Sequence, residues 1–322
     1  MLKAKLKILA RRRKVLAFSL QPFALGGSAF TLIEVLVVVV LLSFIVLSLM
    51  AVFNSTQAAF RASITQSDVL EGGRSVMGLI RNDLDSLTPS FGQYQSNANP
   101  GIIFPVNFAV ATNTWQYQSN ALPLVQSLVP LSTPRTNVLQ NFFLLTRQNQ
   151  TWTGVGYFVD TGSTNYLNPL YRFTISTNVG AASPILLYGI FTNTIVTAVT
   201  NMSHLIDGVL QLTVRAYDPN GRWMTNGYPF GYTNLAKNAW FAPPTLGESS
   251  LILYSNTLPA SVEVDLGVLE DRSIQRAESL FDVVPPAAPT WLRSNYLAQQ
   301  SGKVHLFRQR VPIRNVDPSA YP

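Results

Sequence analysis

Residues 29–53 read AFTLIEVLVVVVLLSFIVLSLMAVF, a run of 25 residues in which Glu34 is the only ionisable side chain. A helix of this length extends about 37 Å at a rise of about 1.5 Å per residue. The hydrocarbon core of a bilayer is only about 30 Å thick. The run therefore predicts a transmembrane helix near the N-terminus.

The positive charge of the chain lies almost entirely before this run. Residues 1–29 carry seven basic side chains and no acidic one, namely Lys3, Lys5, Lys7, Arg11, Arg12, Arg13 and Lys14. Subtracting these seven from the 23 Lys and Arg leaves 16 basic residues against 16 acidic ones, so the rest of the chain is formally neutral. The positive-inside rule then predicts a cytoplasmic N-terminus and a body across the membrane. A neutral body without a basic patch argues against nucleic acid as a partner.

Composition excludes several further classes. The chain has 322 residues and no cysteine, which rules out disulfide scaffolds, thiolate zinc sites, iron–sulfur clusters and cysteine nucleophiles. Its two histidines, His204 and His305, lie about a hundred residues apart and show no ligand spacing. An aromatic content of 11% indicates a folded core in one or two domains.

Glu34 requires an explanation because a carboxylate inside a membrane helix is costly. Two interpretations stay open on charge alone. The carboxylate can lie at the cytoplasmic headgroup level and reach water. Alternatively, it pairs with a positive group that a partner supplies within the membrane.

The motif Gly26-Gly27-Ser28-Ala29-Phe30-Thr31-Leu32-Ile33-Glu34, followed by the apolar run, resembles the type III signal of type IV prepilins and type II secretion pseudopilins. The resemblance implies cleavage between Ala29 and Phe30 by a prepilin peptidase and methylation of Phe30. It also implies that Glu34 neutralises the N-terminal amine of a neighbouring subunit during assembly. The family usually has Gly where this chain has Ala29; because Ala is the smallest alternative, we expect slower cleavage at worst. A signal-peptidase site at Gly27 and Ala29 is the competing interpretation, but the strongest apolar run follows that site instead of preceding it.

The helical pattern continues beyond Phe53 and becomes amphipathic up to about Ser86, where Thr88-Pro89 is expected to end it. Gly72-Gly73 predicts a bend or a close-packing site against the body. We therefore divide the N-terminal part into a leader (1–29), a transmembrane half (30–53) and an amphipathic half (54–88) of one helix.

The remainder predicts a β-rich body over 89–284 and a Pro-rich, basic tail over 285–322. Residues 89–134 are expected to form loops with one or two short strands. A tight turn is expected at Asp218-Pro219-Asn220-Gly221. Strands are expected at 142–147, 153–160, 170–176, 185–192, 209–217 and 261–269. The fold class is α+β and pilin-like, with a long N-terminal helix packed on an antiparallel β-rich body.

Four segments resemble the J-type minor pseudopilins more narrowly. They are GGRSVMGLIRNDLDSL, VGYFVD, VLQLTVRAYDPNGRW and LPASVEVDLGVLED, which begin at residues 72, 155, 209 and 258. The match covers about half of the chain. The general plan is also similar to that of the large prepilin-like proteins of the Verru_Chthon cassette type.

No catalytic motif accompanies this anchor, so we do not expect an enzyme. Glu263 and Asp265 share one face of an expected strand, and with Asp218 and Asn220 they are the weak candidates for a calcium site. A solvated strand face is the more common role of such carboxylates, so we assign no cofactor. The tryptophans are expected in core or interface packing; they are Trp115, Trp152, Trp223, Trp240 and Trp291. Arg308, Arg310 and Arg314 form a basic cluster that either packs on the body or docks a neighbouring subunit.

The sequence thus favours a minor pseudopilin of a type II secretion or type IV pilus-like filament, single-pass in the inner membrane with a periplasmic body. By the resemblance, its partners are the prepilin peptidase, other pilins or pseudopilins, the inner-membrane assembly platform and membrane lipid. The alternative is a membrane-tethered periplasmic binding protein or enzyme that uses a pilin-like anchor.

Overall fold

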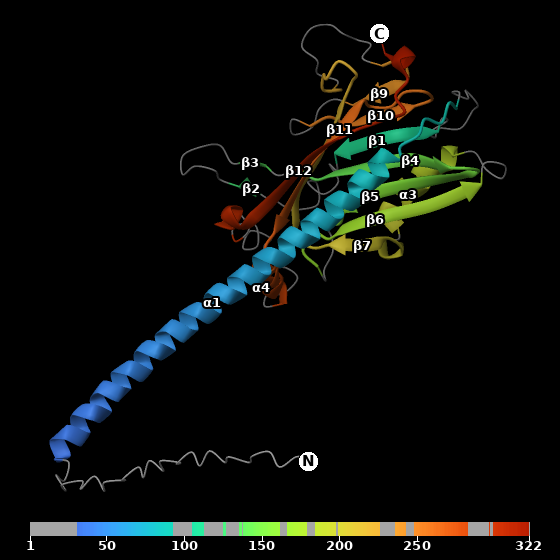
Figure 1. Ribbon diagram of the computed structural model, residues 1–322. Helices are drawn as coiled ribbons and strands as arrows, with labels where there is room; N and C mark the ends of the chain where they lie inside the picture. Colours follow the sequence, from blue (N-terminus) through green and yellow to red (C-terminus); the bar gives the residue numbers. More distant parts are fainter. Residues whose placement is uncertain are drawn as a thin grey trace, which may run out of the picture. The chain divides into compact units, whose positions relative to one another are not determined.

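A computed structural model describes residues 31–92, 105–112, 125–126, 135–136, 138–161, 166–178, 184–197, 199–225, 236–242, 248–282, 296 and 299–321 (Figure 1). The chain divides into two compact units, Met1–Ala59 and Phe60–Pro322. The leader and Phe30 lie outside the described residues. The domain bounds drawn from the sequence at Phe53, Thr88 and residue 284 stay predictions.

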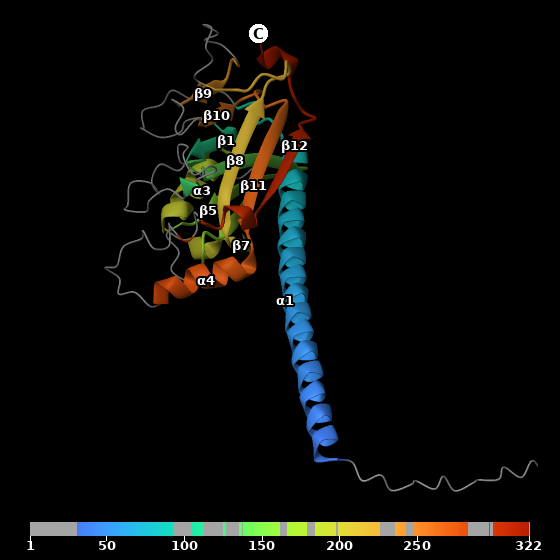
Figure 2. The same ribbon diagram turned by 90° about the vertical axis from the view of Figure 1, so that its left-hand side faces the viewer.

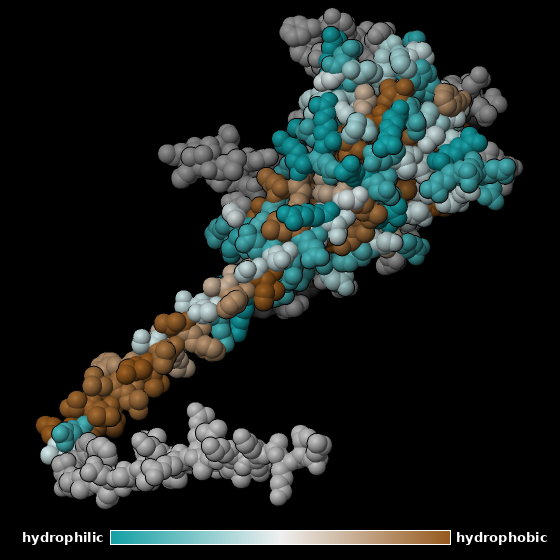
Figure 3. All heavy atoms as spheres, in the orientation of Figure 1, coloured by the Kyte–Doolittle hydropathy of each residue, from teal (hydrophilic) through white to brown (hydrophobic). Residues whose placement is uncertain are grey.

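Helix α1 (Leu32–Asp85) is a single element of 54 residues that contributes to both units. Its bounds agree with the predicted helix, and it ends before Thr88-Pro89 as expected. By length and composition, α1 is able to span a membrane, and its apolar stretch is not buried anywhere within the chain. Figure 3 shows the apolar stretch of α1 as a mostly hydrophobic (brown) surface, with hydrophilic residues at its lower end.

The body contains two main antiparallel sheets. The larger sheet has the spatial order β7 (Ser203–Ile206), β6 (Leu170–Asn178), β5 (Thr151–Val159), β4 (Gln140–Gln148), β1 (Val106–Thr112), β10 (Leu251–Tyr254) and β9 (Ala239–Phe241). The smaller sheet has the order β12 (Val304–Pro312), β11 (Ser261–Leu269) and β8 (Val209–Tyr217). A two-stranded ribbon joins β2 (Val125–Gln126) to β3 (Arg135–Thr136). The α+β class with an antiparallel body is therefore confirmed.

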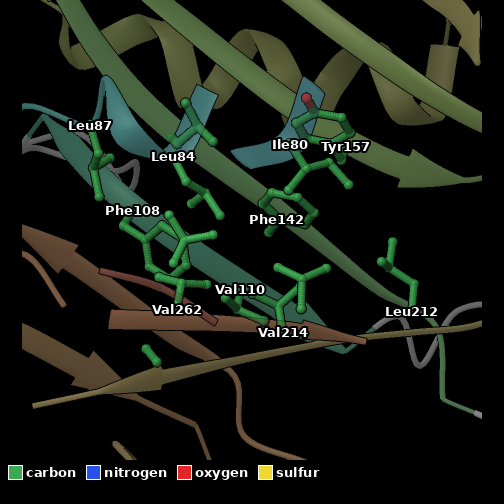
Figure 4. Close-up of a cluster of buried hydrophobic side chains, with 14 of the residues drawn as sticks. Ile80, Leu84, Leu87, Phe108, Val110, Phe142, Tyr157, Leu212, Val214 and Val262 are labelled. Atoms are coloured by element: carbon green, nitrogen blue, oxygen red, sulfur yellow. The ribbon is translucent and has the colours of Figure 1, made fainter. Parts of the chain in front are cut away.

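Helices cover the large sheet on both faces. The second half of α1 and the inner faces of both sheets enclose the main core (Figure 4). On the opposite face, α3 (Ile185–Thr197) closes a second core of mostly aromatic side chains (Figure 2). The amphipathic helix α4 (Asp271–Asp282) covers a smaller cluster next to β11. Short 3-10 turns at Val199–Asn201, Ser301–Lys303 and Pro318–Ala320 complete the described elements.

The strand expected at 185–192 is wrong, because this segment forms helix α3. Leu187, Tyr188 and Phe191 are its buried residues, a spacing that places them on one helical face. Gly156 of the underlying strand β5 leaves room for the Phe191 ring, because a Cβ added at this position would collide with it. The apolar run does not alternate with polar residues, and such a run does not distinguish a buried helix from a strand.

The other five expected strands are confirmed as β4, β5, β6, β8 and β11, with β8 and β11 at the predicted bounds. The turn after β8 is also confirmed. Gly221 has a φ of +76°, and the Asp218 carboxylate accepts a hydrogen bond from the Arg222 amide at 2.7 Å. This left-handed conformation explains the need for glycine at that position.

Candidate functional site

The start of α1 carries a reciprocal pair of capping hydrogen bonds. The Thr31 amide and hydroxyl donate to Glu34 Oε2 at 2.9 and 3.0 Å, while the Glu34 amide donates to Thr31 Oγ1 at 3.4 Å. This is a capping box, which satisfies amides that have no partner in the first helical turn. Glu34 thus has a local partner within its own chain. Ala29 and Phe30, the cleavage and methylation candidates, lie outside the described residues.

The apolar half of α1 presents its side chains outward on every side. Every residue from Leu32 to Phe53 is exposed, including Leu36, Leu42 and Phe44, whose exposed fractions are 56%, 58% and 65%. A helix that is apolar all round is typical of a membrane span or a buried bundle helix. By length and composition this half is therefore able to cross a membrane.

The second half of α1, in contrast, buries part of its surface in the body. Seven of its residues are buried, including Ile80 and Leu84, which are 1% and 0% exposed. Figure 4 shows these two side chains directed into the core that also holds Phe108 and Phe142. At Gly73 the contact is so close that a Cβ would collide with the Phe307 ring. The glycine pair marks a close-packing site, one of the two roles expected for it.

A partly buried ion pair joins this half of the helix to the large sheet. Arg172 of β6 donates to both oxygens of Asp83 at 2.8 and 3.0 Å, and the Tyr157 hydroxyl of β5 donates to the same carboxylate. Burial, followed by the charge of Asp83, raises the pKa of Tyr157 far above 10, so the phenol keeps its proton as a donor. We call Asp83, Tyr157 and Arg172 the helix clamp.

Asp83 is a charged residue of the predicted amphipathic half of the helix, yet the structure buries it. The carboxylate is only 7% exposed. Asp83 follows Ile80 by three residues and immediately precedes Leu84, so it lies on the apolar stripe of the helix. This position was the one signal in the sequence that Asp83 would be buried. Arg172 and Tyr157 gave no comparable signal, because their meeting with Asp83 depends on the tertiary fold.

The carboxylates considered for calcium are held by other groups. Arg308 donates to both oxygens of Asp265 at 2.6 and 2.8 Å. Asp218 holds the turn after β8 through its hydrogen bond to the Arg222 amide. Glu263 lies two residues before Asp265 on the same face, directly opposite Arg310 of β12. Within the described part of the chain, no group of three or more possible ligands converges on one point.

Each histidine has a carboxylate neighbour. His204 Nε2 lies 2.8 Å from Asp207 Oδ1, and its ring stacks on Tyr166 at a centroid distance of 5.2 Å. His305 Nε2 lies 3.3 Å from Glu270 Oε1. The two pairs are separate, since each histidine has a different carboxylate partner.

The tryptophans divide between core and surface. Trp152 is buried in the second core, as expected. The Arg215 guanidinium lies over the Trp223 ring at 5.5 Å, whereas Trp240 is 53% exposed on the short strand β9. Trp115 and Trp291 lie outside the described residues.

The basic cluster packs on the body at two of its three positions. Arg308 pairs with Asp265, as described above. Arg310 donates through Nε to Ser261 Oγ at 2.8 Å and lies over the Tyr217 ring at 3.9 Å. Arg314 follows the strand and is exposed.

Comparison of the chain with protein-family models, with curated proteins and with solved structures gives no match.

Proposed function

We propose that this protein is a pilin-like assembly subunit, specifically a minor pseudopilin of a type II secretion or type IV pilus-like filament. One observation carries the proposal. A single helix, α1, begins within the prepilin-like motif at Leu32, is apolar and exposed in its first half, and packs into a folded body with its second half. Such a helix can hold a body at a membrane and later pack against equivalent helices.

The first half of α1 is the proposed membrane anchor and assembly element. Its exposed leucines and valines suit lipid before assembly and neighbouring helices afterwards. The peptidase, the other subunits and the inner-membrane assembly platform are the proposed partners of this half. The proposed localisation is the inner membrane, with the body in the periplasm.

Glu34 is the proposed registration point of each new subunit. Its carboxylate accepts hydrogen bonds from Thr31 at the start of an apolar helix, where an ionised carboxylate carries a charge that is costly without a counter-charge. Pairing that charge with the Phe30 amine of a neighbour would compensate both groups in a medium where an unpaired charge is costly. A buried pair of this kind is best known for fixing register.

Substitution of Glu34 by glutamine tests this role, because it separates the helix cap from the charge. Glutamine preserves the capping box, so a residue that only caps the helix would tolerate the change. We expect Glu34→Gln to leave the protein in the membrane with its leader removed but absent from filaments. The measurement is disulfide cross-linking between copies that carry introduced cysteines in the apolar half, which is free of background since the chain has no cysteine.

Thr31→Val is the matched control, because it removes the capping hydroxyl and keeps the Glu34 charge. We expect this variant to assemble, with a loss of helix stability of about 1 kcal/mol. Normal cross-linking of Glu34→Gln would contradict the assembly role. It would favour a tethered domain whose activity lies in the body.

A further inference from the structure

We draw no further inference here: the strongest candidate, the uncharged outer face of helix α3 that exposes Leu186, Ile190 and Val196, carries no proposal because nothing in the described part of the structure shows what covers it.

Discussion

The two halves of α1 have the same secondary structure and opposite surroundings. From Leu32 to Phe53 every side chain is exposed, whereas between Val69 and Leu84 five apolar side chains are buried at helical spacing. The first half has apolar residues all round and is exposed along its whole length. In the second half, the buried apolar residues lie along one stripe of the helix, and Asp83 lies on the same stripe. The comparison shows that the distribution of apolar residues around a helix, and not helix formation itself, decides what the helix contacts.

The largest expected effect is loss of the helix clamp in the second half. Asp83→Ala leaves the Arg172 charge and the Tyr157 hydroxyl without their buried acceptor, which should lower the free energy of unfolding by about 3–5 kcal/mol. Near-ultraviolet circular dichroism during chemical denaturation measures this. The control is Asp85→Ala, whose ion pair with Arg81 is long, at 3.8 Å, and exposed. That control should cost no more than about 1 kcal/mol, and an equal loss in both variants would show that Asp83 does not hold the helix.

A charge in the first half should have a different consequence. Leu42→Arg places a cation near the middle of the apolar run, where insertion costs about 2.5–3.5 kcal/mol. We expect reduced membrane retention in cell fractionation and an unchanged melting temperature of the body. Ala62→Arg, an exposed position of the same helix beyond the apolar run, should retain the protein in the membrane. Equal retention of both variants would argue against a membrane span.

Substitution of two glycines of α1 by alanine should change the free energy of unfolding in opposite directions. Gly73→Ala forces a Cβ into the Phe307 ring, and overpacking of this kind costs about 1–3 kcal/mol. Gly78→Ala meets no atom within 4 Å and should gain up to about 1 kcal/mol from helix propensity. Chemical denaturation of the two variants measures both changes. A gain at Gly73 would mean that α1 is not packed closely against β12.

The smallest effect concerns the C-terminal turn of the body. Hydrogen bonds from Asn256, then from Ser319, hold the pKa of Asp317 below its ordinary value of 3.8. A lowered pKa contributes stability above pH 3.8 that is lost as the pH falls through the folded-state pKa. The melting temperature of the wild type should therefore approach that of Asp317→Asn as the pH falls below 3.8. A constant difference at all pH values would contradict the contribution of this carboxylate.

Much of the architecture could be predicted from the sequence because its patterns are local. The uninterrupted apolar run, the amphipathic continuation and Thr88-Pro89 predicted α1, and strict alternation predicted β8. The strand prediction at 185–192 was wrong because its apolar residues do not alternate with polar ones, and the choice between strand and helix depended on how the segment packs on the sheet. Arg172 and Tyr157 could not be placed beside Asp83 for the same reason: they come from β6 and β5, more than 70 residues away.

The most direct test of the central claim is the N-terminal mass of the protein from membranes of cells with and without the prepilin peptidase. A chain that begins at methylated Phe30 only when the peptidase is present is the predicted result, because it would identify the first half of α1 as a processed assembly helix. A chain that begins at Met1 in both strains would contradict the account, and would leave a tethered body whose activity must be sought in its own surfaces.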